Sequence, residues 1–218
     1  MAGGSRLKRA IGGIYSFAAE RFYEPVVVKG AFRVFGGPLN ELVLEQGRQA
    51  VASARGGPIL DMPVGTAYFT IEAARLHDGV MVGADIAEGM VREAGRAARA
   101  AGLTNLSSVR ADAHNLPFSD GAFAAILCTN GLQVIPGTKR ALEELTRVLA
   151  PGATLYVSVV ALPLSALLPQ RAADRLPGLF LRGSDYARLL AAAGLRVAFV
   201  RRSRMAWTIA AAKPEARL

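Results

Sequence analysis

The sequence predicts an α/β protein with a doubly wound, mostly parallel sheet of seven strands that ends in an antiparallel pair. With 218 residues, 52% of them hydrophobic, the chain can bury one substantial core. Apolar runs of strand length alternate with helical segments, and strands joined by helices require right-handed crossovers, hence a parallel sheet. The last two apolar runs have almost nothing between them, so they can only be antiparallel neighbours.

Two regions are expected along the chain. Residues 1–54 are predicted to form an N-terminal helical cap, which Pro25 and the Gly36–Pro38 turn divide into two or three segments. Residues 55–218 form the core, with a short, apolar, proline-broken lid segment at about 160–183.

The elements of the core follow in order. The expected strands are 57–61, 79–84, 106–110, 121–128, 153–160, 195–203 and 204–213. The expected helices are 66–77, 87–101, 137–149 and 184–193. In the third helix, Leu142, Leu145 and Leu149 lie on one stripe, as a core-facing helix requires, and Pro151 with Gly152 is expected to stop it.

Cysteine and histidine usage excludes several kinds of site. Cys128 is the single cysteine, so no internal disulfide can form, which fits a cytoplasmic location. With only His77 and His114 beside it, no transition-metal site is expected. No apolar stretch reaches the roughly 18 residues that span a bilayer. The basic N-terminus, broken by Gly12 and Gly13, favours an amphipathic helix over a signal peptide.

The net charge of +9 has two interpretations. Its densest cluster is "RVAFVRRSR" at 196–204, where the only aromatic residue, Phe199, is expected in the core. Nucleic-acid binding generally needs exposed aromatic residues among the basic ones, so this interpretation is not favoured. The favoured interpretation is a solvated basic face, which aids solubility or contacts an anionic lipid surface or an acidic partner.

Polar residues follow the first four strands. They are Asp61, Asp85, Asp112, and Thr129 with Asn130. A strand-end Asp by itself is usually a turn former or helix N-cap. In a doubly wound sheet, however, ligands bind beyond the carboxyl ends of the strands. Three acids there suggest a ligand with a positive group and with hydroxyls to be hydrogen-bonded. The phosphate-loop pattern G-x-x-x-x-G-K-[ST] is absent.

Four segments between about 55 and 212 resemble the motifs of class I S-adenosylmethionine-dependent methyltransferases, in order and at ordinary spacing. They are "ILDMPVGTAYFT", "MVGADIAEGMVREA", "VRADAHNLPFSDGAFAAILCTNGLQVI" and "ALEELTRVLAPGATLYVS". They look most like the type 11 branch, which resembles the ubiquinone and menaquinone biosynthesis enzymes and acts on small molecules. The resemblance implies a Rossmann-like sheet with the helical cap over the active site, and S-adenosylmethionine as cofactor.

On the methionine side of the cofactor, the resemblance implies that Asp61 orients the loop and the amino group. Gly65 would let the backbone approach the methionine part, and Pro63 stands at the first glycine of the motif. Thr129 and Asn130 would sit beneath the sulfonium.

On the nucleoside side, the resemblance implies that Asp85 bonds both ribose hydroxyls, while Ile86 and Met90 pack against the adenine. Asp112 would accept from the adenine amino group, and the amide of Ala113 would face a ring nitrogen.

The sequence also departs from the family pattern. Pro63 and Ala67 replace glycines, and Ala67 is expected only to tighten the helix start. Ala124 replaces the Asp of "F-D", and Gln133 with Val134 replaces "H-H". No histidine is therefore available there as a base, and the remaining catalytic candidates, both weak, are Asn130 and Gln133.

The function expected from the resemblance is methyl transfer to a small, fairly apolar acceptor such as a quinone, phenol, polyketide or lipid. Catalysis would rest mainly on proximity and alignment. Tyr15, Tyr23 and Gln133 are the expected acceptor contacts, and the protein is expected as a monomer or homodimer. The departures leave an alternative, a non-catalytic relative that binds the cofactor and acts as a partner or regulator. A nicotinamide-dependent dehydrogenase is disfavoured because the loop lacks G-x-G-x-x-G.

Overall fold

A computed structural model gives the structure of the chain and describes residues 37–160, 183–203 and 206–215. Most of the predicted cap, nearly all of the predicted lid, and the expected acceptor contacts Tyr15 and Tyr23 lie outside the described residues.

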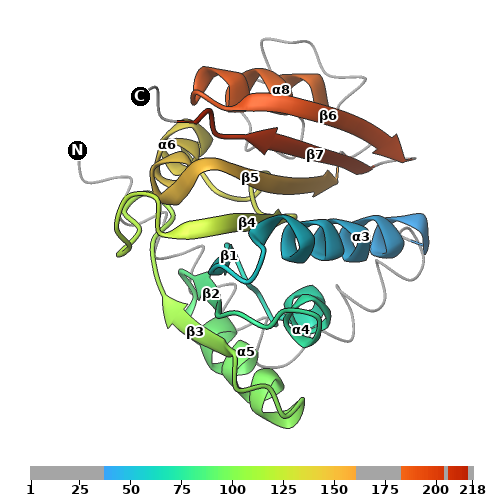
Figure 1. Cartoon of the computed structure of the whole chain (residues 1–218), viewed down its shortest axis with the longest axis vertical. Helices are drawn as coiled ribbons and strands as arrows, with labels where there is room; N and C mark the ends of the chain where they lie inside the picture. The colour runs from blue at the N-terminus through green and yellow to red at the C-terminus, as the bar shows by residue number, and fades with distance from the viewer. Residues whose placement is uncertain (1–36, 161–182, 204–205, 216–218) are drawn as a thin grey trace.

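Seven strands form one sheet in the order β3-β2-β1-β4-β5-β7-β6, from bottom to top in Figure 1. They are β1 Ile59–Asp61, β2 Met81–Asp85, β3 Leu106–Arg110, β4 Phe123–Thr129, β5 Leu149–Val160, β6 Arg196–Ser203 and β7 Ala206–Ala212. The strands β1 to β5 pair in parallel, whereas β7 runs antiparallel to both β5 and β6. This confirms the predicted mostly parallel sheet with a C-terminal antiparallel pair.

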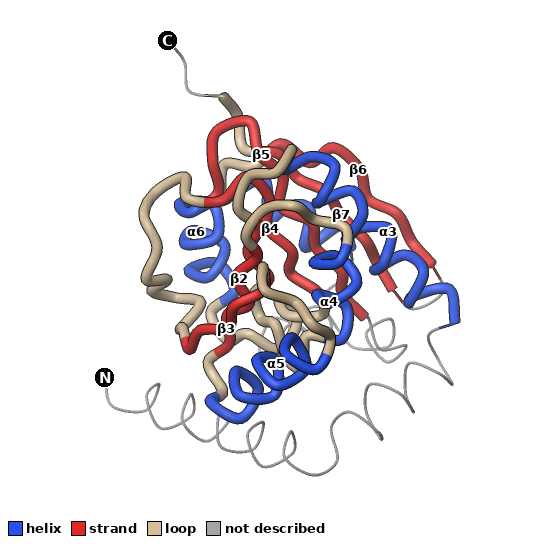
Figure 2. The backbone as a smooth tube through the Cα atoms, turned by 60° about the horizontal axis from the view of Figure 1, so that its bottom comes forward, coloured by secondary structure: helices blue, strands red, loops and turns tan. Residues whose placement is uncertain are grey.

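Helices cover both faces of the sheet. They are α3 Gly37–Ala54, α4 Tyr68–Arg75, α5 Glu88–Ala100, α6 Thr138–Val148 and α8 Gly183–Ala192. On one face, α3 lies mainly against β4 and β5, α5 lies against β2 and β3, and α4 packs between these two helices, as Figure 2 shows. On the other face, Leu142 and Leu145 of α6 and Tyr186 of α8 are almost fully buried. Both helices therefore face the core, as the leucine stripe predicted for α6.

Buried polar contacts fix α3 to the sheet. Gln46 donates from Nε2 to the carbonyl oxygens of Val157 at 3.1 Å and Ile209 at 3.3 Å, which lie on β5 and β7. The hydroxyl of Tyr156 lies 3.3 Å from the Gln49 carbonyl oxygen and 3.2 Å from Ser53 Oγ. The described part of segment 1–54 thus packs on a face of the sheet, and a cap over the site stays a prediction.

The start of β5 differs from the prediction. The strand begins at Leu149, directly after α6, and not at 153. Leu149 is fully buried and pairs with Phe123 of β4, so its backbone is extended although the residue continues the leucine stripe. The helix thus ends at Val148, one residue before its predicted end, and the strand already includes Pro151 and Gly152.

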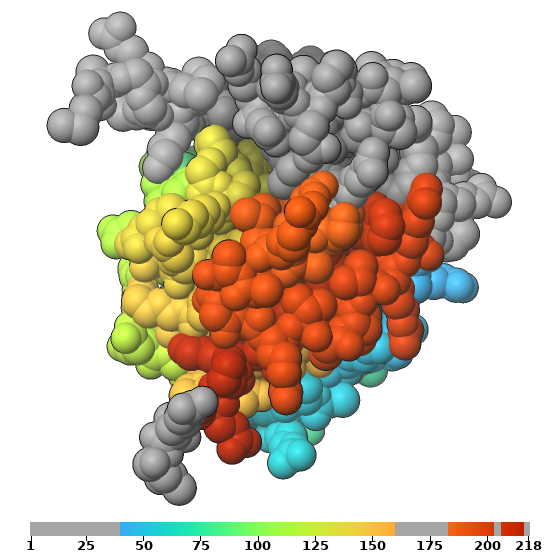
Figure 3. Space-filling model, turned by 90° about the horizontal axis from the view of Figure 1, so that it is seen from above, coloured from blue at the N-terminus to red at the C-terminus, as the bar shows by residue number. Residues whose placement is uncertain are grey.

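The outermost strand β6 carries exposed arginines, and in Figure 3 the surface of this end is formed by residues 183–203, in orange. Phe199 packs against the core but is only half-buried, which corrects its expected core position. The guanidinium of Arg201 lies 4.8 Å from its ring centroid and covers the ring.

Candidate functional site

The predicted polar residues lie along one edge of the sheet. Asp61, Asp85 and Thr129 are the last residues of β1, β2 and β4, and Asp112 follows the end of β3 by two residues. Because these strands are parallel, their carboxyl ends form one edge, and the topology brings the four residues to it.

Asp61 has one oxygen that is hydrogen-bonded and one that is not. Its side chain is buried, and Thr70 of α4 donates to Oδ2 at 2.5 Å. Oδ1 is buried without a hydrogen-bond partner among the described residues. Burial raises the pKa of this carboxyl to about 7; the Thr70 hydroxyl opposes the rise and the nearby Asp85 adds to it. The part of the site that the structure describes therefore contains a buried acceptor to which no residue of that part donates.

The loop of residues 62–67 is fixed between two strands. Met62 donates to Leu127 of β4 at 2.9 Å and Val64 donates to Ala84 of β2 at 2.8 Å, while the Met62–Pro63 bond is cis. Positive φ angles occur at Gly65 (53°) and Ala67 (62°), and Pro63 is not among the positive-φ residues of this loop. A proline is therefore compatible with position 63.

The expectation that Ala67 only tightens the helix start was wrong. This residue is the N-cap of α4 in the left-handed conformation, with φ 62° and ψ 17°. A residue with a β-carbon is strained there, whereas glycine is not.

Asp85 is tied to the same loop. Its Oδ2 accepts the amide of Gly65 at 3.1 Å and its Oδ1 accepts the amide of Ala87 at 2.9 Å. Burial raises the pKa of this carboxyl, and the amides oppose the rise. Since the backbone amide of Ile86 also hydrogen-bonds this carboxylate, three of its four acceptor positions are used within the described residues, and one is left for a hydroxyl donor. Of the other residues predicted here, Met90 is buried in α5 and Ile86 is half-buried.

Asp112 is paired with a histidine that was not predicted as a site residue. His114 donates its amide to Asp112 Oδ1 at 2.9 Å, and its ring Nδ1 lies 2.7 Å from the same oxygen. Its Nε2 lies 2.6 Å from the carbonyl oxygen of Pro136, in the loop after β4. His114 therefore joins two loops of the site. Ala113, the predicted adenine contact between the two residues, is buried.

The loop after β4 begins with a second left-handed residue. Asn130 has φ 53°, and its amide donates to the carbonyl oxygen of Ser158 at 2.8 Å. Its Oδ1, like that of Asp61, is buried without a hydrogen-bond partner among the described residues. Thr129 is half-buried and Gln133 is buried.

Gly131 explains how two loops of the site fit together. A β-carbon at this position would lie 2.1 Å from Pro63 Cδ and 3.0 Å from Cys128 Sγ. The loop after β4 thus touches the proline of the first loop, and only glycine leaves room for the ring. The sequence contains both residues but does not show that they meet.

No group of His, Cys, Asp and Glu that could hold a metal ion is found within the described ranges. Among the helices of those ranges, none is long and apolar enough to cross a membrane. Cys128 is fully buried, and burial raises the pKa of its thiol to about 12, which makes it a poor nucleophile.

Sequence comparison points to one family. Residues 59–152 match the family described as "Methyltransferase domain". The demethylmenaquinone methyltransferase of Clavibacter sepedonicus is 40% identical over 116 residues, which cover 53% of this chain and 46% of that protein. The ubiquinone/menaquinone biosynthesis C-methyltransferase UbiE of Yersinia enterocolitica is 38% identical over 113 residues, covering 50% and 45%. The chain spans about half the length of these relatives.

Solved structures share the fold. A SAM-dependent methyltransferase from Aquifex aeolicus superimposes with a TM-score of 0.65 at 21% identity, over 79% of this chain and 88% of that one. The [4+2]-cyclase SpnF superimposes with a TM-score of 0.70 at 22% identity, over 81% of each chain. The fold alone thus does not determine the reaction.

The residues present suit an S-adenosylmethionine cofactor. Among the described residues, the buried oxygens of Asp61 and Asn130 lack donors and Asp85 keeps an acceptor position, while the loop of residues 62–67 is held between two strands. Together, the matched domain, the relatives and the shared fold confirm that this chain resembles class I S-adenosylmethionine-dependent methyltransferases of the ubiquinone and menaquinone biosynthesis type.

Proposed function

We propose that this protein transfers a methyl group from S-adenosylmethionine to a small, fairly apolar acceptor. The observation that carries the proposal is the buried Oδ1 of Asp61, which has no hydrogen-bond partner within the described ranges and lies near Asp85 at the carboxyl edge of the sheet. A cationic amino group is the ligand that such a carboxylate accommodates best, since an opposite charge offsets the cost of burying it.

When bound, the cofactor supplies a methyl group on a positively charged sulfur. The residues of the chain hold the cofactor in a fixed position. Asp61 accepts from the amino group, and Asp85, held by the amides of Gly65 and Ala87, accepts from the ribose hydroxyls. Asp112 and Ala113 contact the adenine. Such rigid placement raises the rate by aligning acceptor and methyl.

The acceptor side lacks a histidine at the position where the family often has one, because Gln133 and Val134 stand there. Asn130 and Gln133 are the polar candidates to orient the acceptor. A general base is needed only when the acceptor must lose a proton during the reaction. We therefore propose catalysis mainly by proximity and alignment, on an acceptor that is already activated or deprotonates readily.

The named relatives suggest the first acceptor class to test. They act, by their names, on demethylmenaquinone or in ubiquinone and menaquinone biosynthesis. A panel of reduced quinones, phenols and polyketides incubated with cofactor carrying a labelled methyl group would identify the acceptor by mass spectrometry.

Cofactor binding is tested first by titration calorimetry with S-adenosylmethionine and its demethylated product. Asp85→Ala should weaken binding at least tenfold, because it removes the ribose acceptors and a tie to the first loop. Asp78→Ala, an exposed Asp after α4, is the matched control and should leave affinity unchanged. Absence of binding at millimolar ligand would refute the proposal. Binding without turnover on any acceptor would instead favour the alternative, a non-catalytic partner or regulator.

A further inference from the structure

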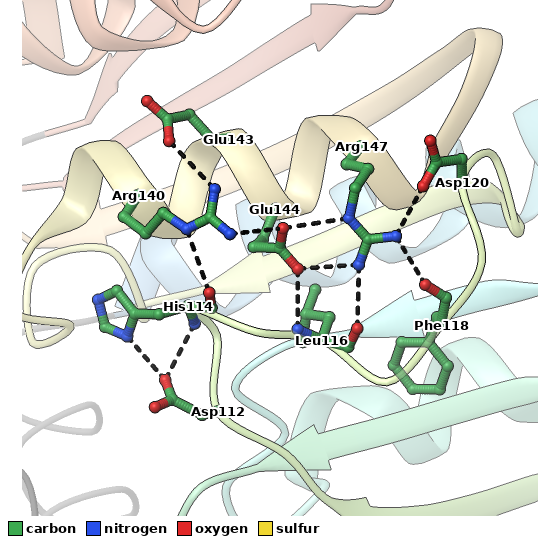
Figure 4. Close-up of polar contacts among 9 residues, drawn as sticks. All are labelled: Asp112, His114, Leu116, Phe118, Asp120, Arg140, Glu143, Glu144 and Arg147. Carbon is green, nitrogen blue, oxygen red and sulfur yellow. Dashed lines mark hydrogen bonds and ion pairs between the residues drawn. The ribbon is translucent and has the colours of Figure 1, made fainter.

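Arg147 of α6 holds the loop between β3 and β4 (Figure 4). Its Nη1 donates to the carbonyl oxygen of Phe118 at 2.7 Å and to Asp120 Oδ1 at 2.8 Å, and its Nη2 donates to the carbonyl oxygen of Leu116 at 2.9 Å. One side chain thus reaches three alternate residues of a loop about 30 positions earlier in the chain.

Glu144, one turn earlier on α6, completes the arrangement. Arg147 donates to its Oε1 at 3.1 Å and to its Oε2 at 2.8 Å. Arg140 donates to Oε1 at 3.2 Å, and the amide of Leu116 donates to Oε2 at 2.9 Å. Together these contacts use all five guanidinium hydrogens of Arg147 and the four acceptor positions of Glu144.

The chemistry of this pair favours a fixed geometry. The hydrogen bonds from Arg147 hold the pKa of the Glu144 carboxyl below its usual range, although burial opposes this. A lysine has a single nitrogen with three donors and cannot reach the three loop residues and both carboxylate oxygens together.

The other end of the same loop is held by His114. Its ring bridges Asp112 and the Pro136 carbonyl oxygen, and Arg140 Nε donates to the His114 carbonyl oxygen at 3.3 Å. The loop is therefore held at both ends, by Glu144 and Arg147 at one and by His114 at the other.

We propose that His114, Glu144 and Arg147, the loop clamp, are positioning residues for the nucleoside half of the cofactor. The inference rests on the proposed function, in which Asp112 and Ala113 of this loop contact the adenine. These two residues are bonded to or adjacent to His114, and the backbone beyond them is anchored at 116 and 118 by α6. The clamp therefore sets where the adenine contacts lie without touching the cofactor.

The test compares two probes, adenosine and S-adenosylhomocysteine, on Arg147→Lys, which keeps the charge. The clamp predicts that this variant weakens binding of both probes by the same factor, at least tenfold, because loss of two or more charged hydrogen bonds releases the loop. Asp61→Asn should weaken only S-adenosylhomocysteine, since adenosine lacks the amino acid part. In steady-state assays, Arg147→Lys should raise KM for the cofactor while kcat at saturation stays within about twofold.

Two controls separate positioning from general destabilisation. Arg96→Ala removes an ion pair with Glu93 on α5, which has the same spacing as the Arg147–Glu144 pair but is exposed. Asp120→Ala removes only the most exposed partner of Arg147. Both should leave adenosine affinity unchanged. The positioning role is refuted if folded Arg147→Lys binds adenosine as tightly as the wild type does. It is also refuted if this variant loses affinity only for S-adenosylhomocysteine. If the wild type binds neither probe, the proposed function fails instead.

Discussion

Two residues of the site adopt left-handed backbone conformations without being glycine. Asn130 tolerates this conformation well, because asparagine is among the non-glycine residues that most often adopt it. Ala67 does not have that advantage, and its β-carbon costs about 1–2 kcal/mol at this φ. Strain of this kind collects at binding sites, where the surrounding contacts hold it in place.

Ala67→Gly should stabilise the protein by about 1 kcal/mol, because relief of the left-handed strain exceeds the greater entropy of glycine in the unfolded chain. Urea unfolding followed by circular dichroism measures the change. Ala73→Gly, in the interior of the same helix with ordinary φ, is the control and should destabilise by a similar amount. An equal loss in both variants would contradict the strain at Ala67.

The buried carboxyl of Asp61 makes stability depend on pH. Its pKa is about 7 in the folded protein against 3.8 as the ordinary value, so the folded state holds the proton more tightly. Relative to Asp61→Asn, the wild type should be most stable below about pH 4 and lose up to about 4 kcal/mol as pH rises through 7. Denaturant midpoints of both proteins at a series of pH values measure this difference. A difference that does not change with pH would show that folding leaves the pKa of Asp61 unshifted.

At the scale of elements, the packing of helix α3 on the sheet depends on the buried side-chain amide of Gln46. Gln46→Ala leaves the Val157 and Ile209 carbonyl oxygens without their donor and should destabilise by about 2–3 kcal/mol. Arg48→Ala on the exposed side of α3 is the control and should change stability by less than about 0.5 kcal/mol. Chemical denaturation compares the two. Equal effects would mean that the side chain of Gln46 contributes no more than a surface residue.

Elements with local signals could be predicted, and those fixed by distant contacts could not. The strand at 106–110 was predicted with its observed bounds, and the acids at the strand ends were located because parallel strands share an edge. The left-handed angle of Ala67 was missed because residue type does not reveal φ where alanine replaces glycine. The bridge from His114 to Pro136 was missed because it forms only when β4 brings two loops together.

On the scale of the whole molecule, the positive charge is unevenly distributed. The described residues hold 15 Lys and Arg against 14 Asp and Glu, a net charge of +1. The remaining 11 basic and 3 acidic residues give the other +8 and belong to residues 1–36, 161–182, 204–205 and 216–218. The excess charge is thus a property of segments outside the described core rather than of its helices.

This distribution predicts binding to anionic lipid. The full chain should float with vesicles containing phosphatidylglycerol and not with phosphatidylcholine alone, because each basic residue near an anionic surface contributes about 1 kcal/mol. Raising the salt to about 0.5 M should release it, since the Debye length shortens. A flotation assay measures both. If equal amounts of protein float with both lipids, or if no protein floats with either, the positive charge does not serve lipid binding.

The saturated pair of Glu144 and Arg147 also constrains how this sequence can change during evolution. Because the hydrogen-bonding capacity of both side chains is filled by each other, by the loop and by Arg140, a substitution at one position leaves unpaired groups at several. Substitutions at positions 144 and 147 should therefore occur together in related chains, whereas position 120, where Asp120 is exposed, should vary independently.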